Sequence, residues 1–133
     1  MKLINYKNIL VVDLSHMTLG DEDIKPISEY VGQNTDLRSL SMADNNFTDR
    51  GMLELINALR VNTHLNHLNI LRNKYLTEES LSVLEEMVSE INMSMYSVEI
   101  DTVIYKDPEI TTRITHQAGL NRAIQENLKP VKV

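Results

Sequence analysis

The stretch that decides the fold reads NTDLRSLSMADNNF over residues 34–47 and returns as NTHLNHLNILRNKYL over residues 62–76. The two copies start 28 residues apart and share aliphatic residues at three matched positions, followed by an asparagine. The same interval towards the N-terminus finds ILVVDLSHMTL over residues 9–19, with Met17 where the asparagine would stand. A fixed period of this length is the signature of stacked repeats, in which each unit is one supersecondary element.

We expect each unit to be a short strand followed by a helix. The alternation around Leu40 and Met42 is that of a strand with one buried face. Asn45 and Asn73 follow the strands, where an amide side chain can satisfy backbone groups of the neighbouring turn. Apolar residues then recur at helical spacing after a helix start at Thr48. The helical residues expected to face the core are Ile24, Ile27, Val31, Met52, Leu55, Ile56, Leu59, Leu81, Leu84 and Val88.

The fourth unit admits two registers. Strict counting places its core positions at Met93, Tyr96 and Val98. Anchoring on the asparagine before each strand places them at Met95, Val98 and Ile100. We favour the second register, because the third unit already has an extra residue in the turn after its strand.

A final helix follows a longer loop, and its sequence echoes the helix of the second unit. The matching residues are Leu120, Ala123, Ile124 and Asn127 in place of Leu55, Ala58, Leu59 and Asn62. We expect the two sets to take equivalent places in the fold.

The pattern resembles intracellular leucine-rich-repeat proteins of the ribonuclease-inhibitor-like class over about residues 9–127. The resemblance implies an α/β solenoid of about four repeats, with a curved parallel β-sheet on the concave side and α-helices on the convex side. The chain is then a single leucine-rich-repeat domain over residues 1–133. Its repeats span about 9–36, 37–64, 65–94 and 95–127, with a short N-terminal cap at 1–8 and a tail at 128–133.

A short array that ends in a strand, a loop and a long helix is also similar to the C-terminal domain of tropomodulin-type actin caps. The tropomyosin- and actin-binding segments that precede this domain in that family have no counterpart in the sequence. The leucine-rich-repeat resemblance implies a protein-binding scaffold or adaptor that is not an enzyme. Tropomodulin-like capping of actin filaments is a further possibility.

Composition restricts the partners. The chain has no cysteine, which excludes disulfides and zinc–thiolate sites. Extracellular members of the class that it resembles usually carry cysteine-bridged caps, so we expect a cytoplasmic, intracellular protein. A net charge of −6 without a basic stripe repels phosphate backbones. No apolar run approaches the roughly 18 residues of a membrane span. We therefore expect protein partners, no nucleic acid and no membrane insertion.

Residues between the core positions of the strands point outward and form columns about 5 Å apart. The first column is Val11, Ser39, His67 and Ser97; the second is Asp13, Ser41, Asn69 and Glu99; the third is His16, Asp44, Arg72 and Thr102. From these we expect the following partner-binding residues: Asp13, His16, Ser41, Asp44, His67, Asn69, Arg72 and Glu99. An ordinary solvated face would also be polar, and there Arg72 and Asp44 would form only a surface ion pair.

Two other surfaces compete with these columns. One is the acidic face of the third helix, formed by Glu78, Glu79, Glu85, Glu86 and Glu90, which is either solvated or docks a basic partner. The other is a solenoid end, where only Leu3, Ile4 and Tyr6 are available to cover the first core layer. The second alternative makes the chain a structural subunit docked into a larger multiprotein assembly.

Catalytic chemistry finds no support in the sequence. No serine has a plausible base and orienting group, and no glycine-rich phosphate loop occurs. His16 with Asp13 and Asp44 is one conceivable ligand cluster, but an open sheet lacks the enclosure and supporting hydrogen bonds that metal ligands need. We expect no catalytic residues, no metal and no cofactor.

Overall fold

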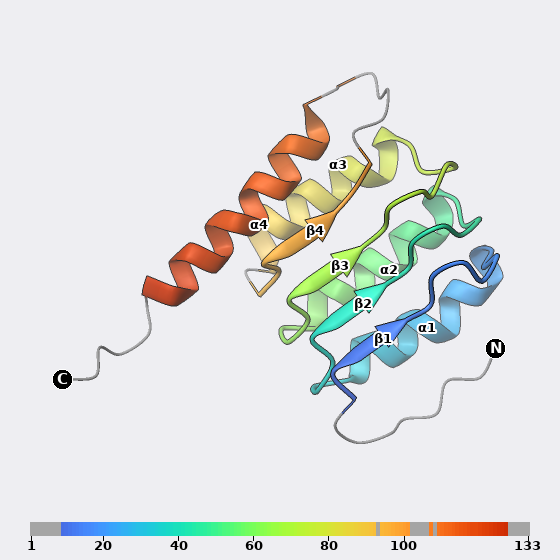
Figure 1. The fold of residues 1–133 in the computed structure, drawn as a ribbon, viewed down its shortest axis with the longest axis horizontal. Coiled ribbons are helices and arrows are strands. Elements are labelled where there is room, and N and C mark those ends of the chain that lie inside the picture. Colours follow the sequence, from blue (N-terminus) through green and yellow to red (C-terminus); the bar gives the residue numbers. More distant parts are fainter. Residues whose placement is uncertain (1–8, 93, 102–106, 108, 128–133) are drawn as a thin grey trace.

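In a computed structural model the chain forms a parallel four-stranded sheet and a layer of helices (Figure 1). The structure describes residues 9–92, 94–101, 107 and 109–127. Within them the order is β1 (Val11–Asp13), α1 (Asp21–Gln33), β2 (Ser39–Ser41), α2 (Asp49–Val61), β3 (His67–Asn69), α3 (Glu78–Glu86), the π-helical turn η1 (Met87–Ile91), β4 (Ser97–Glu99) and α4 (Ile110–Asn127). The strands lie in chain order, so each unit stacks on the one before it. The expected cap at 1–8 and tail at 128–133 lie outside the described residues.

The sheet register confirms the repeat. The middle residues of the strands lie side by side in the order Val12, Leu40, Leu68 and Val98. In the fourth unit Met95, Val98 and Ile100 are all buried, so the register anchored on the preceding asparagine is the correct one. The helical residues predicted to face the core, from Ile24 to Val88, are fully buried without exception.

The interval between β3 and β4 is longer than the others because two residues are inserted in different places. The first lies in the turn after Asn73, as the sequence indicates. The second is in the helix that follows. The amide of Asn92 donates to the carbonyl of Met87, five residues back, whereas that of Asn62 donates to Ala58, four back. A π-helical turn takes up one extra residue in this way, and the sequence analysis missed it.

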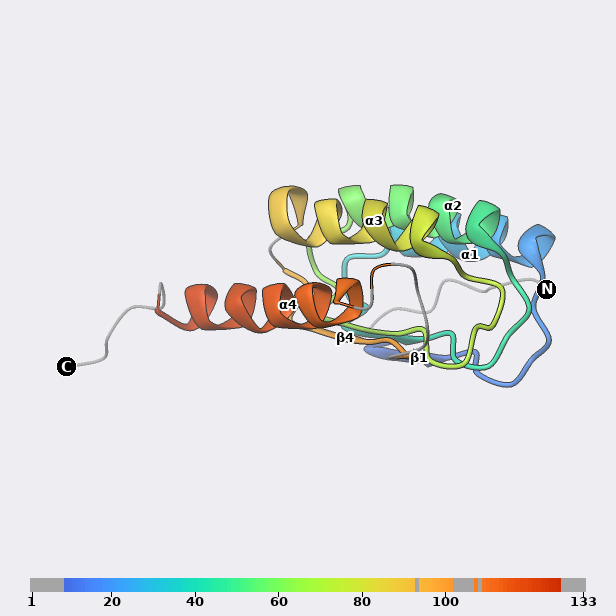
Figure 2. The same cartoon turned by 90° about the horizontal axis from the view of Figure 1, so that it is seen from above.

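The prediction for the last helix is wrong. Leu120 and Ile124 are 42% and 41% exposed, and Ala123 and Asn127 are exposed too. The buried residues of α4 are Ile110, Thr111, Ile114, Ala118 and Asn121. Figure 2 shows why: α4 lies closer to the level of the strands than α1–α3 do, and its C-terminal part runs past the rest of the fold. Because α4 packs against both α3 and β4, it presents a different face from the stacked helices.

Two ladders of asparagines tie the repeats together. After the strands, Asn45 donates to the carbonyls of Leu14 and Met42 at 3.0 Å, and Asn73 donates to those of Met42 and Ile70 at 2.9 and 3.1 Å. These contacts confirm the predicted role of both residues. Each amide thereby satisfies a carbonyl of its own repeat and one of the repeat before it.

The second ladder lies after the helices and was not predicted. Asn62 donates to the carbonyls of Val31 and Asn34 at 2.7 and 3.1 Å. Asn92 repeats this arrangement with Asn62, and Asn121 of α4 ends the ladder on the carbonyl of Val88 at 2.9 Å. The recurrence of the NT sequence at residues 34 and 62 is the signal that could have revealed it.

Acidic residues at the start of the helices bind the start of the next helix. Asp21 accepts hydrogen bonds from the amide and hydroxyl of Thr48, both at 2.7 Å. Asp49 accepts one from the amide of Thr77 at 2.9 Å and others from the hydroxyls of Thr77 and Ser80. Partial burial raises the pKa of both carboxyl groups, but these hydrogen bonds outweigh burial and leave each pKa below its usual value.

Candidate functional site

The candidate site is the side of β1–β4 that α1–α3 leave uncovered, which we call the sheet face (Figure 2). Asp13, Ser41, Asn69 and Glu99 pair in that order across the four strands and form one column. His67 belongs to the neighbouring column, between Ser39 and Ser97. The core side chains point the other way, because successive residues of a strand alternate between its two faces.

Three further candidates, His16, Asp44 and Arg72, lie in the turns that follow β1, β2 and β3. Their φ angles are 60°, 54° and 56°, in the left-handed region that non-glycine residues rarely adopt. The amides of the first two donate to backbone carbonyls of the next repeat, at 3.0 and 2.8 Å. The amide of Arg72 donates instead to a carboxylate oxygen of Asp101 at 2.6 Å. The tight turn therefore recurs at 28-residue intervals. The three residue types at its left-handed position differ, so the sequence does not reveal this recurrence. The fourth member predicted for this column, Thr102, lies outside the described residues.

The structure joins some of these side chains in pairs. Nδ1 of His16 lies 2.5 Å from a carboxylate oxygen of Asp44, and Nε2 of His67 lies 3.0 Å from one of Glu99. Asp44 is therefore paired with a histidine, and among the described residues no ion pair joins it to Arg72. The ion pair considered from the sequence is thus not formed.

The electrostatics of the sheet face favour contacts with another polar surface. Side-chain and backbone hydrogen bonds from Ser15 lower the pKa of Asp13, which stays ionised at neutral pH. The two histidine–carboxylate pairs, His16 with Asp44 and His67 with Glu99, add further polar groups to this face. Across the described part of the chain no three His, Cys, Asp or Glu residues are grouped so that they could hold a metal ion. Hydrogen bonding and charge are what this face offers.

The acidic face of α3 is less available than the sequence indicates. Glu85 accepts two hydrogen bonds from Arg113 of α4, at 3.0 and 3.2 Å. Glu78 accepts one from the amide of Asp107 at 2.7 Å, and Glu86 lies 3.9 Å from an arginine of α2. Three of the five acids are thus used within the fold.

The first end of the solenoid exposes apolar side chains. Leu10, Val11 and Met17 are 54%, 65% and 47% exposed. The cap residues expected to cover this end, Leu3, Ile4 and Tyr6, lie outside the described residues. The exposed residues keep this end as a possible docking surface.

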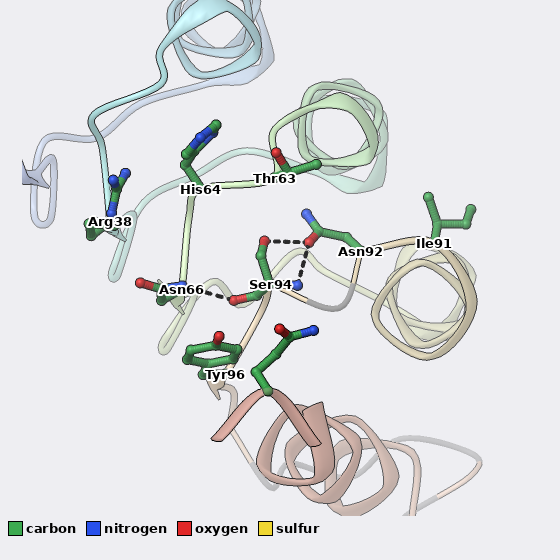
Figure 3. Close-up of a pocket in the computed structure, with 9 residues that line it drawn as sticks. Arg38, Thr63, His64, Asn66, Ile91, Asn92, Ser94 and Tyr96 are labelled. Atoms are coloured by element: carbon green, nitrogen blue, oxygen red, sulfur yellow. Dashed lines mark hydrogen bonds between the residues drawn. The ribbon is translucent and has the colours of Figure 1, made fainter. Parts of the chain in front are cut away.

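A hollow at the edge where the strands begin was not predicted (Figure 3). It has a volume of about 380 Å³. Side chains from the turns before β2, β3 and β4 line it, together with one from α4; among them are Arg38, His64, Asn66, Ile91, Tyr96 and Gln125. The sequence carried no signal for it, because it exists only where α4 overhangs the stacked turns.

Comparisons with known proteins agree with this architecture. A sequence model described as Leucine Rich repeat matches residues 33–55. The solved structure of leiomodin-1 actin-binding site 2 superposes with a TM-score of 0.79 at 17% sequence identity, covering 90% of this chain and 67% of that one. The tropomodulin C-terminal domain of Caenorhabditis elegans superposes with a TM-score of 0.72 at 18% identity, covering 87% of this chain and 70% of that one. The chain thus has a leucine-rich-repeat fold, similar to that of the tropomodulin C-terminal domain.

Within the described residues, no helix has both the length and the apolar character that crossing a membrane requires.

Proposed function

We propose that the chain is a non-enzymatic interaction module that binds a protein partner through the sheet face. The observation that carries the proposal is the alignment of polar side chains in register across four strands, on the side without helices. A solenoid presents its sheet side as an extended binding surface. The contact residues we propose are Asp13, His16, Ser41, Asp44, His67, Asn69, Arg72 and Glu99. The absence of cysteine supports a cytoplasmic setting.

The chemistry of this face supports a protein partner more than a small molecule. Small-molecule sites are concave and mostly apolar, whereas the exposed strand positions here carry mainly hydroxyl, amide, imidazole and carboxylate groups. Such groups form the hydrogen bonds and bridging-water contacts of a polar interface. Positive charge comes from Arg72, whose backbone amide donates to the carboxylate of Asp101 at 2.6 Å.

Actin is the first partner to test, because one of the similar solved structures is that of an actin-binding site. The test is co-sedimentation of the chain with actin filaments, together with elongation at filament pointed ends. Binding that is lost in Arg72→Ala and His67→Ala would support both the partner and the surface. Lys25→Ala, an exposed cation on α1, is the matched control for removal of a charge. No effect on actin in either assay would exclude actin as the partner.

The sheet face has its own test, which does not depend on actin. Affinity capture from the native cell with the parent chain identifies a partner, and capture is repeated with Arg72→Ala, His67→Ala and Lys25→Ala. We expect the first two variants to retain less of that partner than the control. Equal capture by all three would refute the sheet face as the binding surface.

A structural subunit docked through the first solenoid end is the second candidate, favoured by the exposure of Leu10, Val11 and Met17. The mass of the purified chain in solution and its thermal transition separate the two proposals. A soluble, cooperative monomer supports the adaptor. Aggregation that only co-expression with a partner relieves supports the subunit.

A further inference from the structure

A second candidate surface lies at the edge where the strands begin, formed by other residues than those of the sheet face. Here α4 runs past the stacked turns and overhangs the hollow that Arg38, His64 and Tyr96 line (Figures 1 and 3). We call this hollow, whose lining includes the apolar side chain of Ile91 and the ring of Tyr96, the strand-start ledge. We propose that the strand-start ledge binds an acidic, apolar segment of a protein partner.

The charge of the hollow is opposite to that of the molecule. Its lining includes the guanidinium of Arg38, and no carboxylate among the residues that the structure describes there. The chain as a whole has a net charge of −6. Nη1 of Arg38 donates to the carbonyls of Thr35 and Asp36 at 3.0 and 2.8 Å, which holds the guanidinium at the rim. Within the described residues it forms no ion pair, so it is available to a carboxylate from outside.

Part of the lining of the hollow is apolar. Ile91, at the end of η1, lines the hollow and is 44% exposed, and Tyr96 contributes an aromatic ring. The hollow therefore offers a partner apolar contacts beside the cation of Arg38.

The floor of the hollow is already built and satisfied. The side-chain amide of Asn66 donates to the carbonyl of Ser94 at 3.0 Å. The hydroxyl of Ser94 in turn donates to the carbonyl of Leu65 at 3.1 Å. The nearest acid on α4, Glu126, is paired with Arg122 at 3.0 Å. A binding segment would therefore meet a preorganised polar floor with a cation at the rim, which lowers the ordering cost of association.

These features together define the occupant. A free phosphate or another small anion would use Arg38 and leave the apolar lining bare, and a nucleic acid would be repelled by the net charge. A peptide that carries both carboxylate and leucine-like side chains satisfies the cation and covers Ile91 and Tyr96. This surface shares no residue with the sheet face, so the two proposals can fail separately.

The test is binding of a short fluorescein-labelled peptide of glutamate and leucine residues in a glycine–serine background, followed by anisotropy. The matched peptides replace glutamate by glutamine or by lysine. We expect the glutamate peptide to bind, with affinity that falls as salt is raised. Arg38→Gln should weaken it about fivefold, and Ile91→Ser by a similar factor. Lys25→Gln and Arg72→Gln should leave binding unchanged, which separates this surface from general electrostatics and from the sheet face.

Arg38→Lys keeps the charge and should retain most of the binding even though it alters the bonds to the turn. Circular dichroism of each variant confirms that it is folded. Three results would each overturn the proposal: no binding of the glutamate peptide, equal binding of the glutamine peptide, or unchanged binding by folded Arg38→Gln. If the glutamate peptide binds at the ledge while Arg72→Ala captures the partner as well as the parent chain does, only the sheet-face proposal would be refuted.

Discussion

Removing the side chain of Asn62 tests the account of how the repeats are joined. This residue is 3% exposed and makes four hydrogen bonds. Its amide donates to the carbonyls of Val31 and Asn34, and its oxygen accepts from the amides of His64 and Leu65 at 2.8 and 3.0 Å. Alanine at this position would leave all four backbone groups short of a partner in or near the core.

The magnitude follows from these four contacts. At about 1 kcal/mol for each net hydrogen bond, the loss is about 4 kcal/mol. The carbonyl of Val31 retains the amide of Asn34 at 3.4 Å, which reduces the expected loss to about 3 kcal/mol. That is a large part of the 5–15 kcal/mol, roughly, by which a domain is stable. We therefore expect Asn62→Ala to be strongly destabilised.

The measurement is urea unfolding followed by circular dichroism, comparing midpoints at equal slope. The matched control is Asn57→Ala, an exposed asparagine in α2, the helix that Asn62 follows; this variant should gain about 0.5 kcal/mol because alanine is the better helix former. A loss of less than about 1 kcal/mol in Asn62→Ala would show that the ladder does not hold the repeats together.

Three further predictions concern packing and pH. Gly51→Ala should lower the free energy of unfolding by about 2 kcal/mol, because the new Cβ would lie 2.5 Å from a carboxylate oxygen of α1. In Gly119→Ala the new Cβ meets nothing within 4 Å, so this variant should stabilise α4 by about 0.5–1 kcal/mol. Thermal unfolding checks both, and equal effects would contradict the close approach of α1 and α2. The pKa of Asp49 is lower in the folded than in the unfolded chain, so its contribution to stability is present at neutral pH and is lost as the pH falls below about 4. Asp49→Asn should therefore be less stable than the parent at pH 7 and should lose less stability on acidification. Urea midpoints of both proteins, measured at pH values from 7 to below about 4, test this. An equal loss of stability in the parent and the variant would refute it. Leu120→Gln should change stability by less than about 0.5 kcal/mol and Ile114→Ala should cost about 3 kcal/mol, because only the second is buried. The reverse order of unfolding midpoints would mean that α4 packs through the face first expected.

Much of the fold follows from the sequence because its signals are local and repeated. Leu40 and Leu68 lie in the same surroundings one unit apart, so the match of their flanking residues is enough to predict that they are neighbours. The same reasoning identified Val98 as the next member, since the asparagine before it marks where the chain leaves the helix. The candidate columns on the sheet face inherit their alignment from this register.

The pairs within the candidate site could not be predicted in the same way. Arg72 and Asp44 have complementary charges and equivalent positions, yet the carboxylate meets His16. The choice depends on the left-handed turns, which set the direction of each side chain, and φ angles above 50° have no clear mark in residues such as histidine and arginine. The π-helical turn before β4 is hidden for a related reason, because no residue type specifies it.

By itself, then, the sequence determined the period, the order of strands and helices, and which aliphatic side chains line the stacked core. Each of these depends on a residue and its near neighbours in an environment that recurs. Tertiary structure alone decided which face α4 buries and that a hollow opens beside it. The contacts of α4 with both β4 and α3 select its orientation. Leu120 and Ile124 are consequently left exposed at the edge of the fold.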